Sequence, residues 1–229
     1  MYLLAENIWI VDGETVSFYS LPYTTRMTVV RLEEGGLWIH SPVGLTDTLR
    51  KEIDKLGEVK YLIAPNHLHH LFLGEWQEAY PNAQTFGTPE VIDKRRDLKF
   101  DNTLGKQENW PLDGQISQRL FTGSRFMAEC VFFHHRSKTL IVTDLIENFD
   151  PYQFNNLQRP IARLAGILAP EGKMPIDWRL SFMFNKATAR EHMETIIGWN
   201  PERIVMAHGE IIPHDAVPFL MRSFDWLLD

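Results

Sequence analysis

The chain has 229 residues, of which 44% are hydrophobic and 23% charged, and its formal net charge is −7. This composition is that of a globular protein with ample material for a core, and the acidic balance argues against nucleic acid as a partner, because phosphate binding needs a basic surface. A single cysteine, Cys130, excludes an intramolecular disulfide and any cysteine-rich zinc site. The N-terminal residues lack the basic region of a signal peptide, and no apolar run is long enough to span a bilayer. We therefore expect one cytoplasmic domain over residues 1–229, with no membrane partner.

The first half of the chain is rich in predicted strands. Alternating or β-branched runs predict strands at residues 7–11, 15–19, 27–32 and 37–40. Asp12-Gly13 is a hairpin signal between the first two of them. Thr46 is placed to cap a helix that runs to Leu56 with one apolar stripe. A short apolar run at 59–64 has the length of a buried strand.

The second half alternates between further helices and strands. Helices are predicted at residues 73–80, from Pro89 onward, at 161–168 as a buried helix, from Asn185 to 199 and at 215–228. Strands are predicted at residues 83–87, 118–121, 129–134, 139–143 and 204–207. Trp178 and Arg179 could line a pocket, although core packing explains the tryptophan equally well.

The strand at 59–64 ends at a proline, and three histidines, His67, His69 and His70, follow within four positions. In extended backbone, residues two apart point in the same direction, so His67 and His69 could direct two imidazoles at one point. Neutral imidazole is the commonest protein ligand for zinc and suits iron as well. The alternative is a polar loop with unconnected histidines.

Two other apolar strands also end on residues of the ligand type. Asp144 follows the strand at 139–143, and His208 follows the strand at 204–207. Strand ends in layered α/β folds meet at one edge, where loops form the site. Polar side chains cost little there, whereas in mid-strand they would need buried partners. Three such endings in one chain favour a shared metal site over chance.

The order of these motifs resembles the metallo-β-lactamase fold superfamily over nearly the whole chain. It consists of a strand followed by His67-Leu68-His69, a strand ending in Asp144, and a strand ending in His208-Gly209. The resemblance implies a mixed α/β fold, the four-layer αβ/βα sandwich. In that family two metals and a metal-activated water cleave esters, thioesters, lactams or phosphodiesters.

The chain departs from the family at half of its ligand positions. The motif His-X-His-X-Asp-His is matched only at His67 and His69, because Leu71 and Phe72 stand in place of its aspartate and last histidine. The third-motif histidine should fall near residues 125–128, where this chain has no histidine. The resemblance is therefore to a divergent, functionally undescribed branch with an incomplete ligand set.

The resemblance implies one divalent transition metal, with zinc expected and iron or manganese as alternatives. The implied ligands are His67, His69, Asp144 and His208, with Asp144 also the catalytic residue. The sequence leaves open whether a lost ligand is replaced by Glu129, His70 or His40. The expected function is hydrolysis of a small-molecule ester, lactam or phosphodiester. The alternatives are a non-catalytic or structural-metal descendant of the fold and an iron-dependent oxidoreductase, and a homo-oligomer is also left open.

Overall fold

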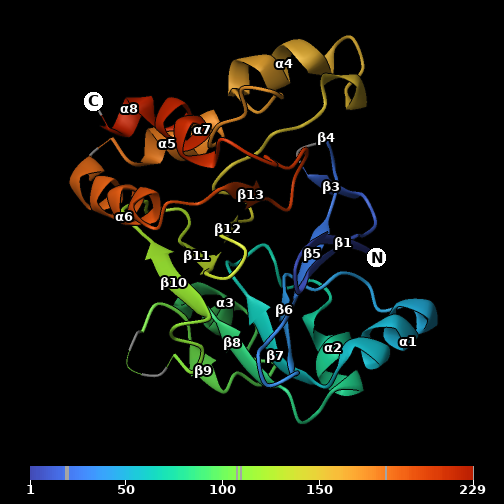
Figure 1. Cartoon of the computed structure of the whole chain (residues 1–229). Coiled ribbons are helices and arrows are strands. Elements are labelled where there is room, and N and C mark those ends of the chain that lie inside the picture. The colour runs from blue at the N-terminus through green and yellow to red at the C-terminus, as the bar shows by residue number, and fades with distance from the viewer. Residues whose placement is uncertain (19–20, 107, 109, 184, 229) are drawn as a thin grey trace.

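The computed structural model describes residues 1–18, 21–106, 108, 110–183 and 185–228. Two main sheets lie at its centre (Figure 1). The first has the strand order β1-β2-β5-β6-β7-β8-β9, with bounds Tyr2–Ala5, Ile8–Asp12, Arg26–Arg31, Leu37–His40, Val59–Ala64, Gln84–Gly87 and Asn102–Thr103. The second has the order β10-β11-β12-β13, with bounds Ile116–Phe121, Glu129–His134, Thr139–Ile141 and Arg203–Val205.

Helices cover the outer face of each sheet, on opposite sides of the molecule (Figure 1). Those on the first sheet are α1 (Asp47–Leu56), α2 (Leu73–Ala79) and α3 (Pro89–Lys94). Those on the second sheet are α5 (Ile176–Ser181), α6 (Lys186–Gly198), α7 (Ala216–Ser223) and α8 (Asp225–Leu228). A third apolar cluster, with Trp38 and Phe132 fully buried, fills the space between the sheets. These layers form the predicted αβ/βα sandwich.

Local sequence signals account for most of the elements around the future site. Thr46 caps α1, because its hydroxyl accepts a hydrogen bond from the Leu49 amide at 3.2 Å. β7 matches the predicted apolar strand, and it pairs in parallel with both β6 and β8. β12 likewise pairs in parallel with β13. Within each sheet, parallel strands deliver the residues that follow them to the same edge.

Two predictions about local structure were wrong, and one predicted strand extends beyond the described residues. Asp12-Gly13 does not join a hairpin, because β2 pairs with β1 and β5, whereas β3 (Val16–Phe18) pairs with β4 (Leu21–Tyr23) in a separate small sheet. The helix predicted to be buried at 161–168 is α4 (Gln158–Ala165), whose apolar residues are largely exposed. The strand predicted at 15–19 is seen as β3, and Tyr19 lies outside the described residues.

The C-terminal segment differs from the prediction in one respect. The helix expected at 215–228 is divided into α7 and α8 at Phe224. A short helical turn, η2 (Pro151–Gln153), precedes α4. None of the helices in the described part of the chain has the length and apolarity needed to cross a bilayer.

Candidate metal centre

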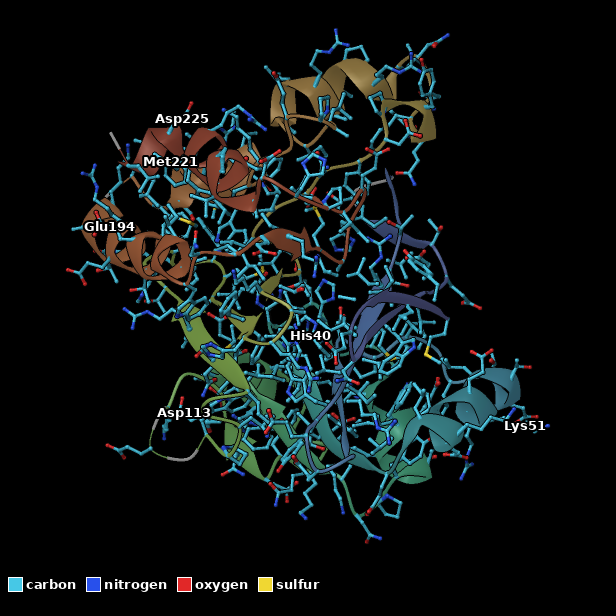
Figure 2. The ribbon with its side chains drawn as sticks, in the orientation of Figure 1. His40, Lys51, Asp113, Glu194, Met221 and Asp225 are labelled. Carbon is cyan, nitrogen blue, oxygen red and sulfur yellow. The ribbon has the colours of Figure 1, made fainter. Side chains whose placement is uncertain are left out.

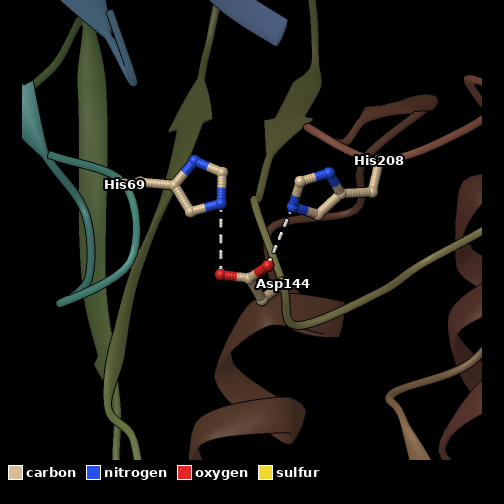
Figure 3. Close-up of side chains that lie close together, drawn as sticks. All are labelled: His69, Asp144 and His208. Atoms are coloured by element: carbon tan, nitrogen blue, oxygen red, sulfur yellow. Dashed lines mark ion pairs between the residues drawn. The ribbon is translucent and has the colours of Figure 1, made fainter. Parts of the chain in front are cut away.

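Three side chains from the ends of three strands meet at one edge of the sandwich. His69 follows β7, Asp144 follows β12 and His208 follows β13, and one ligand atom of each lies within 4.8 Å of the other two. His69 Nε2 is 3.2 Å from one carboxylate oxygen of Asp144, and His208 Nε2 is 3.0 Å from the other (Figure 3). Both imidazoles therefore direct the same type of nitrogen at one carboxylate.

The second ring nitrogen of His208 determines how this histidine can act. Nδ1 lies 2.6 Å from the carbonyl oxygen of Thr24. A carbonyl can only accept, so Nδ1 carries a proton and donates it. In the neutral ring the lone pair is then on Nε2, which faces Asp144. Two facing lone pairs repel, so a cation, either a proton or a metal ion, has to lie between them.

Without a metal, a proton fills that role. Burial lowers the pKa of His208, but the hydrogen bond and charge of Asp144 outweigh it and raise this pKa above its ordinary value. Burial would raise the pKa of Asp144, yet His69 and His208 hold it well below its usual range. With a metal, two imidazole nitrogens and a carboxylate oxygen would supply three protein ligands, the open arrangement of catalytic zinc sites.

The second ring nitrogen of His69 also has a hydrogen-bond partner. Its Nδ1 lies 2.6 Å from the hydroxyl of Ser41, which directly follows β6 and has a φ of +53°. Such outer hydrogen bonds fix the orientation of a ligating ring. Tyr23 packs edge-on against His208, with ring centroids 5.0 Å apart. Both rings are thus oriented by neighbours that do not themselves belong to the group of three.

His67 lies outside this group, and the backbone after β7 explains why. Asn66 Oδ1 accepts hydrogen bonds from the amides of Leu68 and His69, at 2.8 and 3.1 Å, so the chain turns there instead of continuing as a strand. The assumption of extended backbone is therefore wrong, and His67 and His69 do not share a direction. His67 Nδ1 instead lies 3.0 Å from Glu90 Oε2.

His70 and His40 are also held away from the group. His70 Nδ1 is 3.0 Å from Arg95 Nη1, and burial, together with the charges of Lys94 and Arg95, lowers the pKa of His70 to about 4. His40 lies in the interior (Figure 2), stacked on Trp38 with ring centroids 5.3 Å apart. Neither of its ring nitrogens has a hydrogen-bond partner among the described residues. Burial, followed by the charge of His69, lowers its pKa well below the ordinary value.

Glu129 positions the loop that carries Asp144. It is fully buried, and its carboxylate accepts hydrogen bonds from the amides of Thr143, Asp144 and Leu145, at 2.7, 2.8 and 3.0 Å. Asn66 Nδ2 lies 3.2 Å from the same carboxylate and 2.7 Å from Asp144 Oδ2. Glu129 is thus a support for the site, in contrast to the open possibility that it replaces a ligand.

The hydrogen-bonded side chains of Asn66, Glu129 and Asp144 join the loops that follow β7 and β12, which belong to different sheets. Burial and the charge of Asp144 raise the pKa of Glu129 to about 7, whereas hydrogen bonds from Thr143 and from the Asp144 amide oppose that shift. Sequence reasoning missed the role of Asn66 altogether. The available signal was an asparagine immediately after Pro65 at the end of an apolar strand, a position typical of a turn.

Two cavities meet at Asp144. The narrower, of about 210 Å³, adjoins His69 and His208, and the wider, of about 660 Å³, adjoins Glu147 and Trp178. Tyr23, Leu68 and Asp144 line both. Asp144 is therefore reachable from both cavities and the two histidines from the narrower one, as a site for a small molecule requires.

A second buried carboxyl lies beside the wider cavity. Glu147 is 3% exposed, and the Tyr23 hydroxyl donates to its Oε2 at 3.2 Å. Burial, reinforced by Asp144, raises the pKa of Glu147 to about 8. Glu147 therefore binds a proton at neutral pH in the folded chain and releases it on unfolding.

Glu147→Gln is expected to stabilise the metal-free protein increasingly as the pH rises. The native carboxyl stays protonated up to about pH 8, whereas the unfolded one ionises near its ordinary value of 4.5, so the native chain loses stability between these values. Glutamine removes that loss, which amounts to roughly 2–4 kcal/mol at the upper end. Thermal melts of both proteins over this range measure the difference, with exposed Glu171→Gln as control. Parallel pH dependences would contradict the assignment.

Comparison with known proteins assigns the chain to a family. Residues 5–162, more than half of the chain, match the family described as "Domain of unknown function (DUF4336)". No curated protein matches the sequence. Many solved structures do match, however, and those reported next are each under 25% identical to this chain.

The DIM-1 metallo-beta-lactamase exposed to ceftazidime has 15% identity and a TM-score of 0.67, covering 99% of this chain and 94% of that one. FIM-1 from Pseudomonas aeruginosa, in the mono-zinc form, has 6% identity and a TM-score of 0.64, covering 97% and 92%. The rubredoxin oxygen:oxidoreductase from Desulfovibrio gigas has 15% identity and a TM-score of 0.66, covering 99% of this chain and 61% of that one. The predicted resemblance in fold is thereby confirmed. The chain belongs to the DUF4336 family, and its fold is that of the metallo-β-lactamases.

Proposed function

We propose that this protein is a metal-dependent hydrolase of a small molecule, with one divalent metal held by His69, Asp144 and His208. The observation that carries the proposal is the pair of Nε2 atoms directed at one carboxylate, with His208 Nδ1 already committed to a carbonyl. The bound metal would activate water as a nucleophile at neutral pH. An ester, a lactam or a phosphodiester is the class of bond that this chemistry cleaves.

Neighbouring residues orient the proposed metal ligands, and apolar side chains beside them favour a single metal. Ser41 and the Thr24 carbonyl fix the two rings, and Glu129 fixes the loop of Asp144. Apolar Leu71 and Phe72 line the narrower cavity at the positions where the second metal's ligands would stand in the superfamily. This supports one metal in the site, with zinc as the expected ion.

A second candidate function is redox chemistry at iron. Two imidazoles and one carboxylate with open positions also form the ligand set of non-haem iron(II) oxygenases. The donor set alone does not favour zinc over iron. Metal identity and substrate turnover therefore have to be measured together.

Metal analysis of protein purified without chelator or affinity resin is expected to give about one transition metal per chain, because three protein ligands form a single open site. The loaded protein should hydrolyse members of an ester, lactam and phosphodiester panel, and His69→Ala should remove that activity. His214→Ala is the matched control, since its side chain is 80% exposed and lies outside the group of three.

Two results would contradict the hydrolase. A metal content near zero after metal-supplemented expression would indicate a metal-free descendant of the fold. Full loading without any rate above that of His69→Ala would leave a structural or redox metal. A large drop in the melting temperature of His69→Ala would then indicate structure, whereas a lost redox signal with little drop would indicate iron chemistry.

A further inference from the structure

The backbone that carries His208 lies beyond the end of its strand. Because β13 ends at Val205, the carbonyl groups of Met206 and Gly209 lie outside the ladder that joins β12 and β13. Met206 is fully buried, and a buried carbonyl without a donor is costly. Gly209 has a φ of +94°, and a Cβ atom there would collide with the carbonyl oxygen of Asn148. The turn after His208 therefore requires glycine, and its carbonyl groups need donors from elsewhere in the chain.

Arg26, the first residue of β5, donates to both of these carbonyls. Its Nη1 lies 3.1 Å from the oxygen of Met206 and 2.8 Å from that of Gly209, one on each side of His208. Its Nε donates to Asp12 at 2.7 Å, which fixes the guanidinium from the other side. The Arg26 side chain is only 11% exposed, and hydrogen bonds from a charged donor are about twice as strong as neutral ones. One side chain thus holds the backbone on both sides of a proposed metal ligand.

The residues just before Arg26 hold the imidazole ring of the same histidine. The Thr24 carbonyl accepts the proton of His208 Nδ1, and the Tyr23 ring packs edge-on against the imidazole. Residues 23–26 therefore contact both the ring of His208 and its backbone. Together these contacts determine the direction of Nε2, the atom that faces Asp144 (Figure 3).

We propose that Arg26 is a positioning residue for His208 and sets the direction from which Nε2 approaches a bound metal ion. This inference rests on the metal site of the proposed function, although it does not depend on hydrolysis. Arg26 and the strand before His69 belong to the first sheet, whereas His208 follows a strand of the second. The guanidinium therefore fixes the loop of one histidine relative to the sheet that carries the other. Without Arg26 both ligands remain, but their alignment is lost.

Arg26→Met keeps the unbranched stem of the side chain and removes its donors. We expect it to lower metal affinity by about tenfold or more in chelator competition, as the loss of an outer partner of a metal ligand does. The cobalt(II)-loaded variant should also have an altered visible absorption spectrum, because this spectrum reports how the ligands are arranged around the ion. Arg26→Lys keeps the charge but not the planar fork, so it should recover part of the affinity. Arg31→Met is the matched control, since Arg31 is an exposed arginine at the other end of the same strand.

The His208 ring reports the same positioning in metal-free protein. In NMR spectra of protein with isotopically labelled histidine, the Nδ1 proton of His208 should be protected from solvent exchange, because the Thr24 carbonyl accepts it. We expect Arg31→Met to keep this protection and Arg26→Met to lose it. If Arg26→Met does not fold, the same measurements are made on Arg26→Lys.

Two results would overturn the inference. The first is a lower melting temperature of Arg26→Met with native metal affinity, cobalt spectrum and proton exchange, because Arg26 would then only stabilise the fold. The second is an equal effect of Arg31→Met. If the native chain binds no metal, the proposed function fails, and the exchange of the Nδ1 proton alone decides the role of Arg26. If affinity and proton protection both depend on Arg26 while no panel substrate is hydrolysed, the positioning role stands and the hydrolase fails.

Discussion

Glu129→Ala is expected to destabilise the protein by about 3–5 kcal/mol, because three buried amides lose their acceptor at once. Each buried donor that is left without a partner costs on the order of 1–3 kcal/mol. The loss is measured as the change in the free energy of unfolding in urea. Metal affinity should fall as well, because the loop that carries Asp144 is no longer held.

Glu78→Ala on α2 provides the control for this change, since its side chain is exposed and surface substitutions remain within about 0.5 kcal/mol. Glu129→Gln keeps the shape and one acceptor oxygen, so it should lie between the alanine variant and the native chain. A loss below about 1 kcal/mol for Glu129→Ala would show that the amides find other partners.

His69→Ala is expected to lower metal affinity more than about 100-fold, whereas His67→Ala should lower it less than about tenfold. Changes to the outer partners of metal ligands already cost 10–100-fold, so the loss of a ligand itself should exceed that range. The two histidines are only two positions apart, which makes them a matched pair. Competition with a chromophoric chelator gives both affinities on one scale.

The same measurement separates two ligand sets for this site. If both variants lost affinity equally, His67 would belong to the site, and the four-ligand set that the sequence implies would be restored. A small effect of both would remove His69 and leave the assigned group without its third ligand. The structure predicts the unequal result, because Asn66 turns the backbone between the two imidazoles.

The fold was predictable from the sequence because its signals are local. Thr46 marks the start of α1, and apolar runs mark β6 and β7 as strands buried in the sandwich. Helix α4 was misjudged because apolar residues in a helical segment do not show by themselves that the helix is buried. Burial depends on what packs against those residues, and Ile161 and Leu164 remain 61% and 77% exposed.

The candidate site was predictable only in part. Three of its four proposed ligands lie together, because each lies in the segment that follows an apolar strand and strand ends share an edge. The fourth, His67, depended on the backbone direction over three residues, and two amide hydrogen bonds accepted by the Asn66 side chain change that direction. The supporting role of Glu129 depends on contacts between segments about 15 residues apart or more, and pattern reading along the chain carries no such information.

The three side chains do not belong to the same half of the sandwich. His69 follows a strand of the first sheet, whereas Asp144 and His208 follow strands of the second. An ion held by all three would therefore be a cross-link between the two layers, and its binding free energy would add to the docking of one layer on the other. We expect loss of the ion to weaken the contact between the two layers before it affects either sheet.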